Sequence, residues 1–206
     1  MYRIIVSDIF GRTATLEKMA NSLPGNVEIC DPYDTGVSSF ESEHEAYSCF
    51  SSKVGLNKYV EKLARKVRSL PGAVTLLGFS MGGSAIWRLS STHGLKNVSG
   101  AVCFYSSQVR HYSTAVPNFP IQMIFPKEEP MFSVSRMMEV LATTPQVDVS
   151  HSSYLHGFMN PQSQNYNEQG YRMYSRALNR VPADQCFTSC DWDESKLEPG
   201  EAYPLS

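Results

Sequence analysis

Short apolar runs alternate with amphipathic stretches along most of the chain. Continuous apolar runs predict strands at residues 2–6, 27–30, 73–77, 98–105, 121–125 and 146–150. Apolar positions at helical spacing, ended in several places by Gly or Pro, predict helices at residues 13–23, 56–70, 81–91, 134–141 and 164–181. Regular alternation of strands and helices is typical of a parallel sheet covered on both faces. We therefore expect an α/β fold with a mostly parallel sheet.

Two polar segments interrupt this pattern. Residues 35–55 are rich in Ser and Glu, and we expect a loop or a cap region there. Residues 183–206 contain six acidic residues and one lysine, whereas the chain before them has a small basic excess. This difference predicts an α/β domain at residues 1–182 and an acidic extension at 183–206. We expect the extension to be solvated and loosely packed; a regulatory or partner-binding tail is the alternative.

The overall composition restricts the classes of partner and compartment. With 42% hydrophobic and 18% charged residues, the 206-residue chain can bury a sizeable core. Its net charge of −2 offers no basic surplus for nucleic acid, and no apolar stretch approaches the ~20 residues that span a membrane. The N-terminal apolar run is too short for a signal peptide. We therefore expect a cytoplasmic protein with neither nucleic-acid nor membrane partners.

The cysteines indicate neither a disulfide framework nor a metal site. They number five, an odd count, and their spacing is irregular. Cys186 and Cys190 form a single C-x3-C pair without a neighbouring histidine, which makes a poor zinc site. Reduced thiols are typical of the cytoplasm. We expect no metal and no organic cofactor.

The clearest chemical feature is a G-x-S-x-G motif, formed by Gly78-Phe79-Ser80-Met81-Gly82. It lies between an apolar strand and a predicted helix, which is the setting of a nucleophile elbow. Glycine at positions 78 and 82 avoids collisions around the strained backbone that such a serine adopts. The helix that follows directs its amides and positive dipole end at the reacting oxygen. We expect Ser80 to be a nucleophile; the alternative is a glycine-rich turn with an incidental serine.

A serine hydroxyl needs a base, and the base needs an acid that orients it. In this type of fold the order along the chain is serine, acid, histidine. His151 and His156 both follow the last predicted strand, and His156 is favoured because it lies in a loop beside Gly157. His151 directly adjoins the strand, and we expect it to be a surface residue at the strand end.

The acid is expected after the strand at residues 121–125, where Glu128 and Glu129 both occur. We favour Glu129, and Glu128 is the alternative. The triad would then consist of Ser80, Glu129 and His156. Several aromatic residues near these positions are expected to line an acyl pocket, with burial in the core as the alternative: Phe10, Tyr33, Phe79, Tyr105 and Phe158.

Four segments together resemble the dienelactone hydrolase family, whose small members have the α/β-hydrolase fold. The first two are Asp8-Ile9-Phe10-Gly11 and Cys30-Asp31-Pro32-Tyr33. The other two are the G-x-S-x-G motif and His156-Gly157-Phe158. The resemblance covers about residues 2–181 and supports Glu129 as the acid. It implies that the backbone amides of Ile9 and Met81 form an oxyanion hole, where such donors are worth about 2.7–4 kcal/mol each.

The resemblance also places Asp8 near the nucleophile, where it would take part in substrate binding. An aspartate in a loop before a helix can instead cap that helix. For Asp8 the helix would be the one that starts near Thr13. Both interpretations of Asp8 remain open at this point.

The chain departs from the best-known members of the family at several positions. Those members use cysteine and aspartate where this chain has Ser80 and a glutamate. They also bind a substrate carboxylate with arginines, whereas this chain has Asn160 four positions after His156 and no arginine at residues 32–64. The same segment instead carries the acidic residues Asp34, Glu41, Glu43 and Glu45. The missing arginines and these carboxylates predict a neutral substrate, unless another arginine reaches the pocket. The candidates for such a residue are Arg12, Arg88 and Arg110.

Together these features predict a serine hydrolase that cleaves an ester or lactone of a small molecule through an acyl-enzyme. A thioesterase or related acyl-transfer enzyme on the same fold is one alternative. A non-catalytic binding module is the other, and a complete triad in the expected order argues against it.

Overall fold

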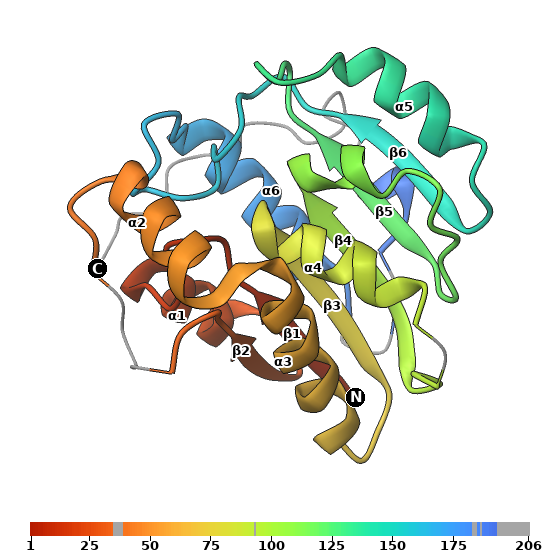
Figure 1. Ribbon diagram of the computed structural model, residues 1–206. Helices are drawn as coiled ribbons and strands as arrows, with labels where there is room; N and C mark the ends of the chain where they lie inside the picture. The colour runs from red at the N-terminus through yellow and green to blue at the C-terminus, as the bar shows by residue number, and fades with distance from the viewer. Residues whose placement is uncertain (35–38, 93, 183–184, 186, 193–206) are drawn as a thin grey trace.

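The computed structural model describes residues 1–34, 39–92, 94–182, 185 and 187–192. Its centre is a single sheet formed by β1 (Tyr2–Val6), β2 (Asn26–Cys30), β3 (Val74–Phe79), β4 (Val98–Phe104), β5 (Ile121–Phe125) and β6 (Val147–His151). The strand order is β2-β1-β3-β4-β5-β6, and every neighbouring pair is parallel (Figure 1). The predicted α/β class with a parallel sheet is therefore confirmed.

Helices cover both faces of the sheet. On one face lie α3 (Gly55–Ser69), α4 (Met81–Ser90) and α5 (Val134–Ala142), and on the other lie α1 (Ala14–Ser22) and α6 (Glu168–Arg180). Figure 1 shows α3 and α4 in front of the sheet and α6 behind it. Because successive strand residues point to opposite faces, Ile4 packs into the first core and Ile5 into the second. Burial on both faces explains why the strands are almost continuously apolar.

The segment at residues 35–55 corrects the expectation of a loop. Residues 35–38 lie outside the described part, but α2 spans Glu43–Cys49 and continues into a π-helical segment, Phe50–Val54. The side chain of Ser42 accepts a hydrogen bond from the Glu45 amide and caps α2. Ala46 and Phe50 are buried, so one apolar face holds this polar segment against the core. The many Ser and Glu residues of this segment made its few apolar positions hard to recognise as one helical face in the sequence.

The beginning of the acidic extension also differs from the expectation of a loosely packed tail. Phe187 and Trp192 are almost fully buried in the core on the α6 side. The Trp192 ring lies 5.6 Å from that of Phe104, and its centroid is 6.1 Å from that of Tyr174. The guanidinium of Arg3 lies 5.0 Å from the Phe187 ring centroid. Residues 183–184, 186 and 193–206, which carry most of the acidic charge, lie outside the described residues.

Three cysteines in the described part of the chain are free thiols: Cys30, Cys49 and Cys103. Burial raises the pKa of Cys30 to about 12, so this thiol stays protonated at neutral pH. The side chains of Cys186 and Cys190 are not among those described. Within the same part of the chain, no helix combines the length and the apolar character needed to cross a membrane.

The strand order brings two loops together at one edge of the sheet. β1 is followed in sequence by β2 on one side and has β3 as its neighbour on the other, so the winding direction reverses between β1 and β3. Val6 of β1 is paired with Gly78 of β3. The loop after β1 and the turn after β3 therefore lie side by side at the carboxyl ends of the strands. Parallel α/β sheets bind their ligands at such a switch point.

Candidate active site

Ser80 occupies a sharp turn between β3 and α4. Its backbone has φ 49° and ψ −110°, a conformation that non-glycine residues rarely adopt. A Cβ atom at Gly78 would lie 2.6 Å from the Gly83 Cα, and one at Gly82 would lie 2.1 Å from the Val6 carbonyl oxygen. Glycine is therefore required at both positions by close backbone contact. The predicted strand–turn–helix placement of the motif is confirmed.

Three side chains meet at this turn. The Ser80 hydroxyl lies 2.8 Å from His156 Nε2, and His156 Nδ1 lies 2.6 Å from Glu129 Oε1. The side chain of His156 is 22% exposed and that of Glu129 is 6% exposed. One ring nitrogen is thus held by a buried carboxylate while the other faces the serine hydroxyl. This is the arrangement in which a serine, a histidine and an acid can generate a nucleophile.

The structure distinguishes the two candidate acids and the two candidate bases by position. Glu129 forms a short antiparallel bridge with Phe132 and directs its carboxylate to His156, whereas Glu128 is exposed. His151 is also exposed, at the end of β6, and its Nε2 lies 3.1 Å from the Lys127 carbonyl oxygen. The contacts expected for Glu129 and His156 are therefore present. Their catalytic roles remain predictions.

A hydrogen bond from Asn165 and a glycine turn hold the loop that carries His156. Asn165 donates a hydrogen bond from Nδ2 to the His156 carbonyl oxygen at 3.0 Å. Gly157 has φ 86°, and a Cβ there would lie 2.3 Å from Ser163 Oγ. Glycine is needed at this position for both reasons. Only the glycine beside the histidine signalled this turn in the sequence; nothing pointed to Asn165 or Ser163.

Asp8 lies in the loop after β1 and is 8% exposed. Its Oδ1 accepts a hydrogen bond from the Phe10 amide at 3.0 Å, and its Oδ2 accepts one from Asn160 Nδ2 at 2.6 Å. Burial raises the pKa of Asp8 to about 6, and the Asn160 hydrogen bond opposes that rise. The alternative of Asp8 as a helix cap is wrong, because the Thr13 side chain caps α1.

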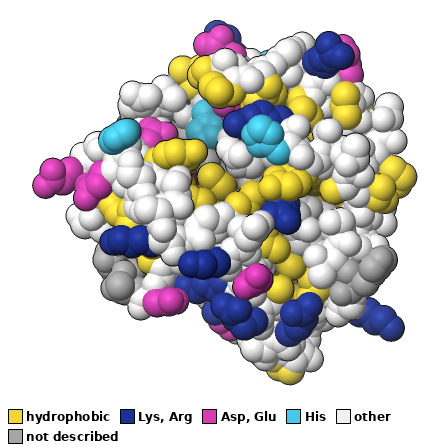
Figure 2. Space-filling model, in the orientation of Figure 1, with side chains coloured by type: hydrophobic (Ala, Val, Ile, Leu, Met, Phe, Trp, Pro, Cys, Tyr) yellow, Lys and Arg dark blue, Asp and Glu magenta, His cyan; other side chains and the backbone are white. Residues whose placement is uncertain are grey.

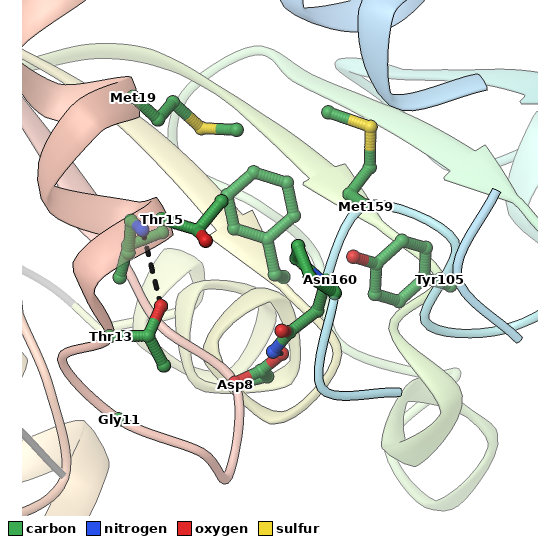
Figure 3. A pocket seen from close by; sticks show the side chains of 11 residues that line it. Asp8, Gly11, Thr13, Thr15, Met19, Tyr105, Met159 and Asn160 are labelled. Carbon is green, nitrogen blue, oxygen red and sulfur yellow. Dashed lines mark hydrogen bonds between the residues drawn. The ribbon is translucent and has the colours of Figure 1, made fainter. Parts of the chain in front are cut away.

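A small cavity lies beside this carboxylate. Figure 3 shows Asp8, Asn160 and Tyr105 together on one side of it and Met19 on another. Its volume of about 20 Å³ has room for about one water molecule. Phe79 and Tyr105, two of the aromatic residues expected near a substrate, contribute to its lining.

The five aromatic residues singled out from the sequence are all buried, but they have different surroundings. The Tyr105 ring centroid is 5.1 Å from that of His156, and Phe79 stacks on Phe104 at 5.3 Å. Phe158 is completely buried, so in this structure it is a core residue with no surface for a substrate. Phe10 and Tyr33 pack in the other core, and the Tyr33 hydroxyl donates to the Ile9 carbonyl.

The two backbone amides expected to form an oxyanion hole belong to the neighbouring loops. Met81 is the first residue of α4, so its amide has no hydrogen-bond partner within the helix. Ile9 lies in the loop after β1, between Asp8 and Phe10, and both Ile9 and Met81 are 8% exposed. The reversal of winding between β1 and β3 thus brings both loops to the same edge. Binding of an oxyanion there remains a prediction.

The three arginines considered for the pocket have different partners. Arg12 forms an ion pair with Glu17, and Arg88 bonds to Asn57. Arg110 donates to the Ser107 carbonyl and lies 5.8 Å from the ring centroid of Phe132, the residue that bridges to Glu129. All three arginines are thus held by other residues, and of the three it is Arg110 that lies near a residue paired with Glu129.

Comparison with known proteins identifies the family of the chain. The sequence model of the dienelactone hydrolase family matches residues 2–181, which is nearly the whole of the described fold. The chain belongs to the dienelactone hydrolase family. One relative of this family member is the uncharacterized protein YczH of Bacillus subtilis, 28% identical over 171 residues. That match covers 80% of this chain and 83% of the relative.

Solved structures show the same fold at low sequence identity. A Klebsiella pneumoniae protein assigned to the dienelactone hydrolases has a TM-score of 0.65 and 16% identity, covering 86% of this chain and 84% of that one. A dienelactone hydrolase-like promiscuous phosphotriesterase from metagenomic libraries has a TM-score of 0.58 and 13% identity, covering 86% and 84%. The predicted α/β-hydrolase fold is confirmed, and family and fold together indicate a hydrolase.

Proposed function

We propose that this member of the dienelactone hydrolase family is a serine hydrolase that cleaves a carboxylic ester or lactone of a small molecule. The observation that supports the proposal most strongly is the continuous contact from Ser80 through His156 to Glu129. The serine lies on a strained turn at the switch point of a parallel sheet. A serine on such a turn, beside an oriented base, is the arrangement used for acyl transfer.

In the proposed reaction His156 Nε2 accepts the Ser80 proton while the serine oxygen attacks the substrate carbonyl. The carbonyl oxygen becomes an oxyanion, and the amides of Ile9 and Met81 stabilise it. His156 then gives the proton to the leaving alcohol, and the acyl group stays on Ser80. Water attacks this acyl-enzyme in the same way and releases the acid. Glu129 keeps the imidazole in the required tautomer and stabilises its protonated form.

The proposed substrate is neutral around the reacting carbonyl. Asn160 lies four residues after the base. Its Nδ2 donates a hydrogen bond to Asp8, and its Oδ1 accepts one from the Gln162 amide at 2.9 Å. The position at which the best-known family members have a substrate-binding arginine thus holds an asparagine bonded to the protein's own carboxylate, Asp8. A substrate carboxylate brought near Asp8 would meet a like charge and lose its hydration without a cationic partner.

Purified protein assayed with p-nitrophenyl butyrate tests the proposal. We expect Ser80→Ala and His156→Ala each to reduce kcat by about 10⁴-fold or more, and their double variant to lose no more than either alone, because triad members act as a unit. Ser91→Ala is a matched control at the other end of α4, and it should keep wild-type activity. Wild-type activity in Ser80→Ala would reject the mechanism. Failure of the wild type to hydrolyse neutral esters and lactones would favour a non-catalytic binding protein.

A further inference from the structure

Hydrogen bonds hold both ends of one peptide group in the loop after β1. The carbonyl oxygen of Ile9 accepts a hydrogen bond from the Tyr33 hydroxyl at 2.7 Å. The amide of Phe10, which belongs to the same peptide group, donates to Asp8 Oδ1 at 3.0 Å. Rotation of this peptide group would break both bonds at once. Its orientation is therefore fixed by two side chains from different parts of the sequence.

The preceding peptide group, between Asp8 and Ile9, is oriented as well. The Asp8 carbonyl oxygen accepts hydrogen bonds from the Gly11 amide and from the Ser7 hydroxyl, each at 3.1 Å. In a trans peptide the N–H points opposite to the C=O, and the described chain has no cis bonds. The Ile9 N–H therefore points away from Gly11 and Ser7, on the side opposite to these donors.

Tyr33 is itself held firmly in the loop after β2. Its amide donates to Asp31 Oδ1 at 2.8 Å, and its carbonyl oxygen accepts from Lys62 Nζ at 2.6 Å. Its ring packs against Phe40 with 5.5 Å between centroids, and the residue is 9% exposed. The hydroxyl that reaches Ile9 is thus carried by a buried side chain anchored at both backbone ends. Such a group can define the position of a neighbouring loop.

We propose that Tyr33 is a positioning residue of the oxyanion hole, acting through the Ile9 carbonyl rather than through contact with substrate. The inference rests on the proposed function, in which the Ile9 amide binds the oxyanion. The bonds to the Asp8 carbonyl orient the Ile9 N–H from one side, and the Tyr33 hydroxyl holds the Ile9 carbonyl on the other. Without that hydroxyl the carbonyl end of Ile9 is released, and the Ile9 amide can shift from its position relative to the reacting oxygen. A donor aimed at the oxyanion acts mainly in the transition state, so its misalignment lowers kcat more than it changes KM.

Tyr33→Phe is the direct test, because it removes the hydroxyl and keeps the ring. With p-nitrophenyl butyrate we expect kcat to fall by about 10- to 100-fold, somewhat less than the loss of a whole oxyanion donor, while KM changes less than twofold. A trifluoromethyl ketone forms a tetrahedral adduct with an active-site serine and places an oxyanion in the hole. Its inhibition constant should rise by about the same factor as kcat/KM falls.

Tyr59→Phe is the matched control. This residue is fully buried, and its hydroxyl donates to the carbonyl oxygens of Ser7, the first residue after β1, and of Cys30, the last residue of β2, at 2.9 and 2.8 Å. The hydroxyl also lies 3.3 Å from Ser7 Oγ, but within the described part of the chain it makes no hydrogen bond to Ile9 or Phe10. The substitution removes a buried tyrosine hydroxyl, as Tyr33→Phe does, but leaves the hydrogen bonds of the Ile9–Phe10 peptide in place. We expect kcat of this variant to stay within twofold of the wild type. Thermal unfolding of both variants shows whether each is folded.

Asp8 provides a second test at the other end of the same peptide. Asp8→Asn keeps an oxygen that can accept the Phe10 amide, whereas Asp8→Ala removes it, so we expect a kcat at least threefold higher for the asparagine variant. In the double variant Tyr33→Phe/Asp8→Ala, the fold-decrease in kcat should be smaller than the product of the two single fold-decreases, because both side chains act on one peptide group.

Two outcomes would overturn the inference: kcat of Tyr33→Phe within twofold of the wild type, or an equal loss of kcat in Tyr59→Phe. Covalent labelling separates this failure from a failure of the proposed function. If a fluorophosphonate labels Ser80 in the wild type and Tyr33→Phe has normal kcat, only the role of Tyr33 is wrong. If Ser80 is not labelled in the wild type, the proposed function itself is wrong.

Discussion

At the scale of single residues, Glu129 and Glu128 are adjacent carboxylates with opposite surroundings. Glu129 lies against His156 Nδ1, and Glu128 is exposed. We predict that Glu129→Gln lowers kcat by about 10²- to 10⁴-fold, because an amide no longer fixes the imidazole tautomer or stabilises its charge. Glu128→Gln, one position away, should stay within twofold of the wild type. Steady-state kinetics with one neutral ester gives kcat of both variants. Equal decreases in kcat would contradict the assignment of Glu129 as the acid.

Asp8 links the site to the pH dependence of stability. Burial raises its pKa from 3.8 to about 6, so the folded protein binds this proton more tightly than the unfolded chain. The stability that Asp8 contributes is therefore fully present below about pH 4 and is lost as the pH rises through about 6. The raised pKa corresponds to a loss of about 3 kcal/mol over that interval.

We predict that Asp8→Asn removes this part of the pH dependence. Relative to the wild type, the variant should gain about 2 kcal/mol in free energy of unfolding between pH 4 and pH 7.5. Urea unfolding of both proteins at the two pH values measures the difference. Asp148→Asn, at an exposed strand position, controls for the loss of one negative charge. An Asp8→Asn effect that is the same at both pH values would contradict the prediction.

At the scale of elements, the site depends on how closely α4 approaches the end of β1. A Cβ at Gly82 would lie 2.1 Å from the Val6 carbonyl oxygen and 2.4 Å from that of Ser7. We predict that Gly82→Ala costs about 1–3 kcal/mol of stability by forcing helix and strand apart, and that it lowers kcat. Gly72→Ala is the control, since its Cβ would meet the Tyr2 ring at an ordinary 3.6 Å. Equal unfolding midpoints (Tm) of Gly82→Ala and Gly72→Ala would argue against this close approach.

Most elements of the fold could be predicted from the sequence because hydrophobic periodicity is a local signal. All six strands and the helices α1, α3, α4, α5 and α6 lie close to their expected ranges. The helix α2 was missed because its polar residues outnumber the few, such as Ala46, that reach the core. The burial of Trp192 was missed for a similar reason, since the surrounding acidic composition suggested a solvated segment.

The site was predictable only in part, for a physical reason. The G-x-S-x-G motif and the order of serine, acid and histidine are visible along the chain. The hydrogen bond that Asn160 donates to Asp8 joins residues 152 positions apart, and no local sequence pattern predicts it. The same holds for the Tyr33 hydroxyl, which was expected near a substrate and instead bonds to the Ile9 carbonyl.

At the scale of the whole molecule, charge is unevenly distributed around the sheet. Figure 2 shows lysine and arginine side chains gathered in the lower half of the view, where α3 lies, away from α2. The loops at the carboxyl edge instead carry Asp8 and, at the start of α2, Glu43. Burial is the main cause of the raised pKa of Asp8, and the charge of Glu43 adds to it. Two carboxylates, Asp8 and Glu43, therefore lie near each other, and Asp8 also lies near His156.

From this distribution we predict a preference for neutral acyl groups. Specificity constants for two p-nitrophenyl esters, butyrate and hemisuccinate, should differ at least tenfold in favour of butyrate, about 1.4 kcal/mol in transition-state binding. Arg110→Ala tests whether the cation beside Phe132 assists acidic substrates; we expect it to leave the ratio within twofold. A tenfold or greater advantage for hemisuccinate would contradict the proposed substrate class.

The central claim is that Ser80 is the nucleophile of this family member. The most direct measurement is reaction with a fluorophosphonate, followed by peptide mass mapping of the adduct. We expect one adduct on Ser80, none in Ser80→Ala, and labelling at least about 100-fold slower in His156→Ala, because the base that activates the serine is gone. An adduct on another residue, or ester hydrolysis by a protein whose Ser80 stays unlabelled, would contradict it.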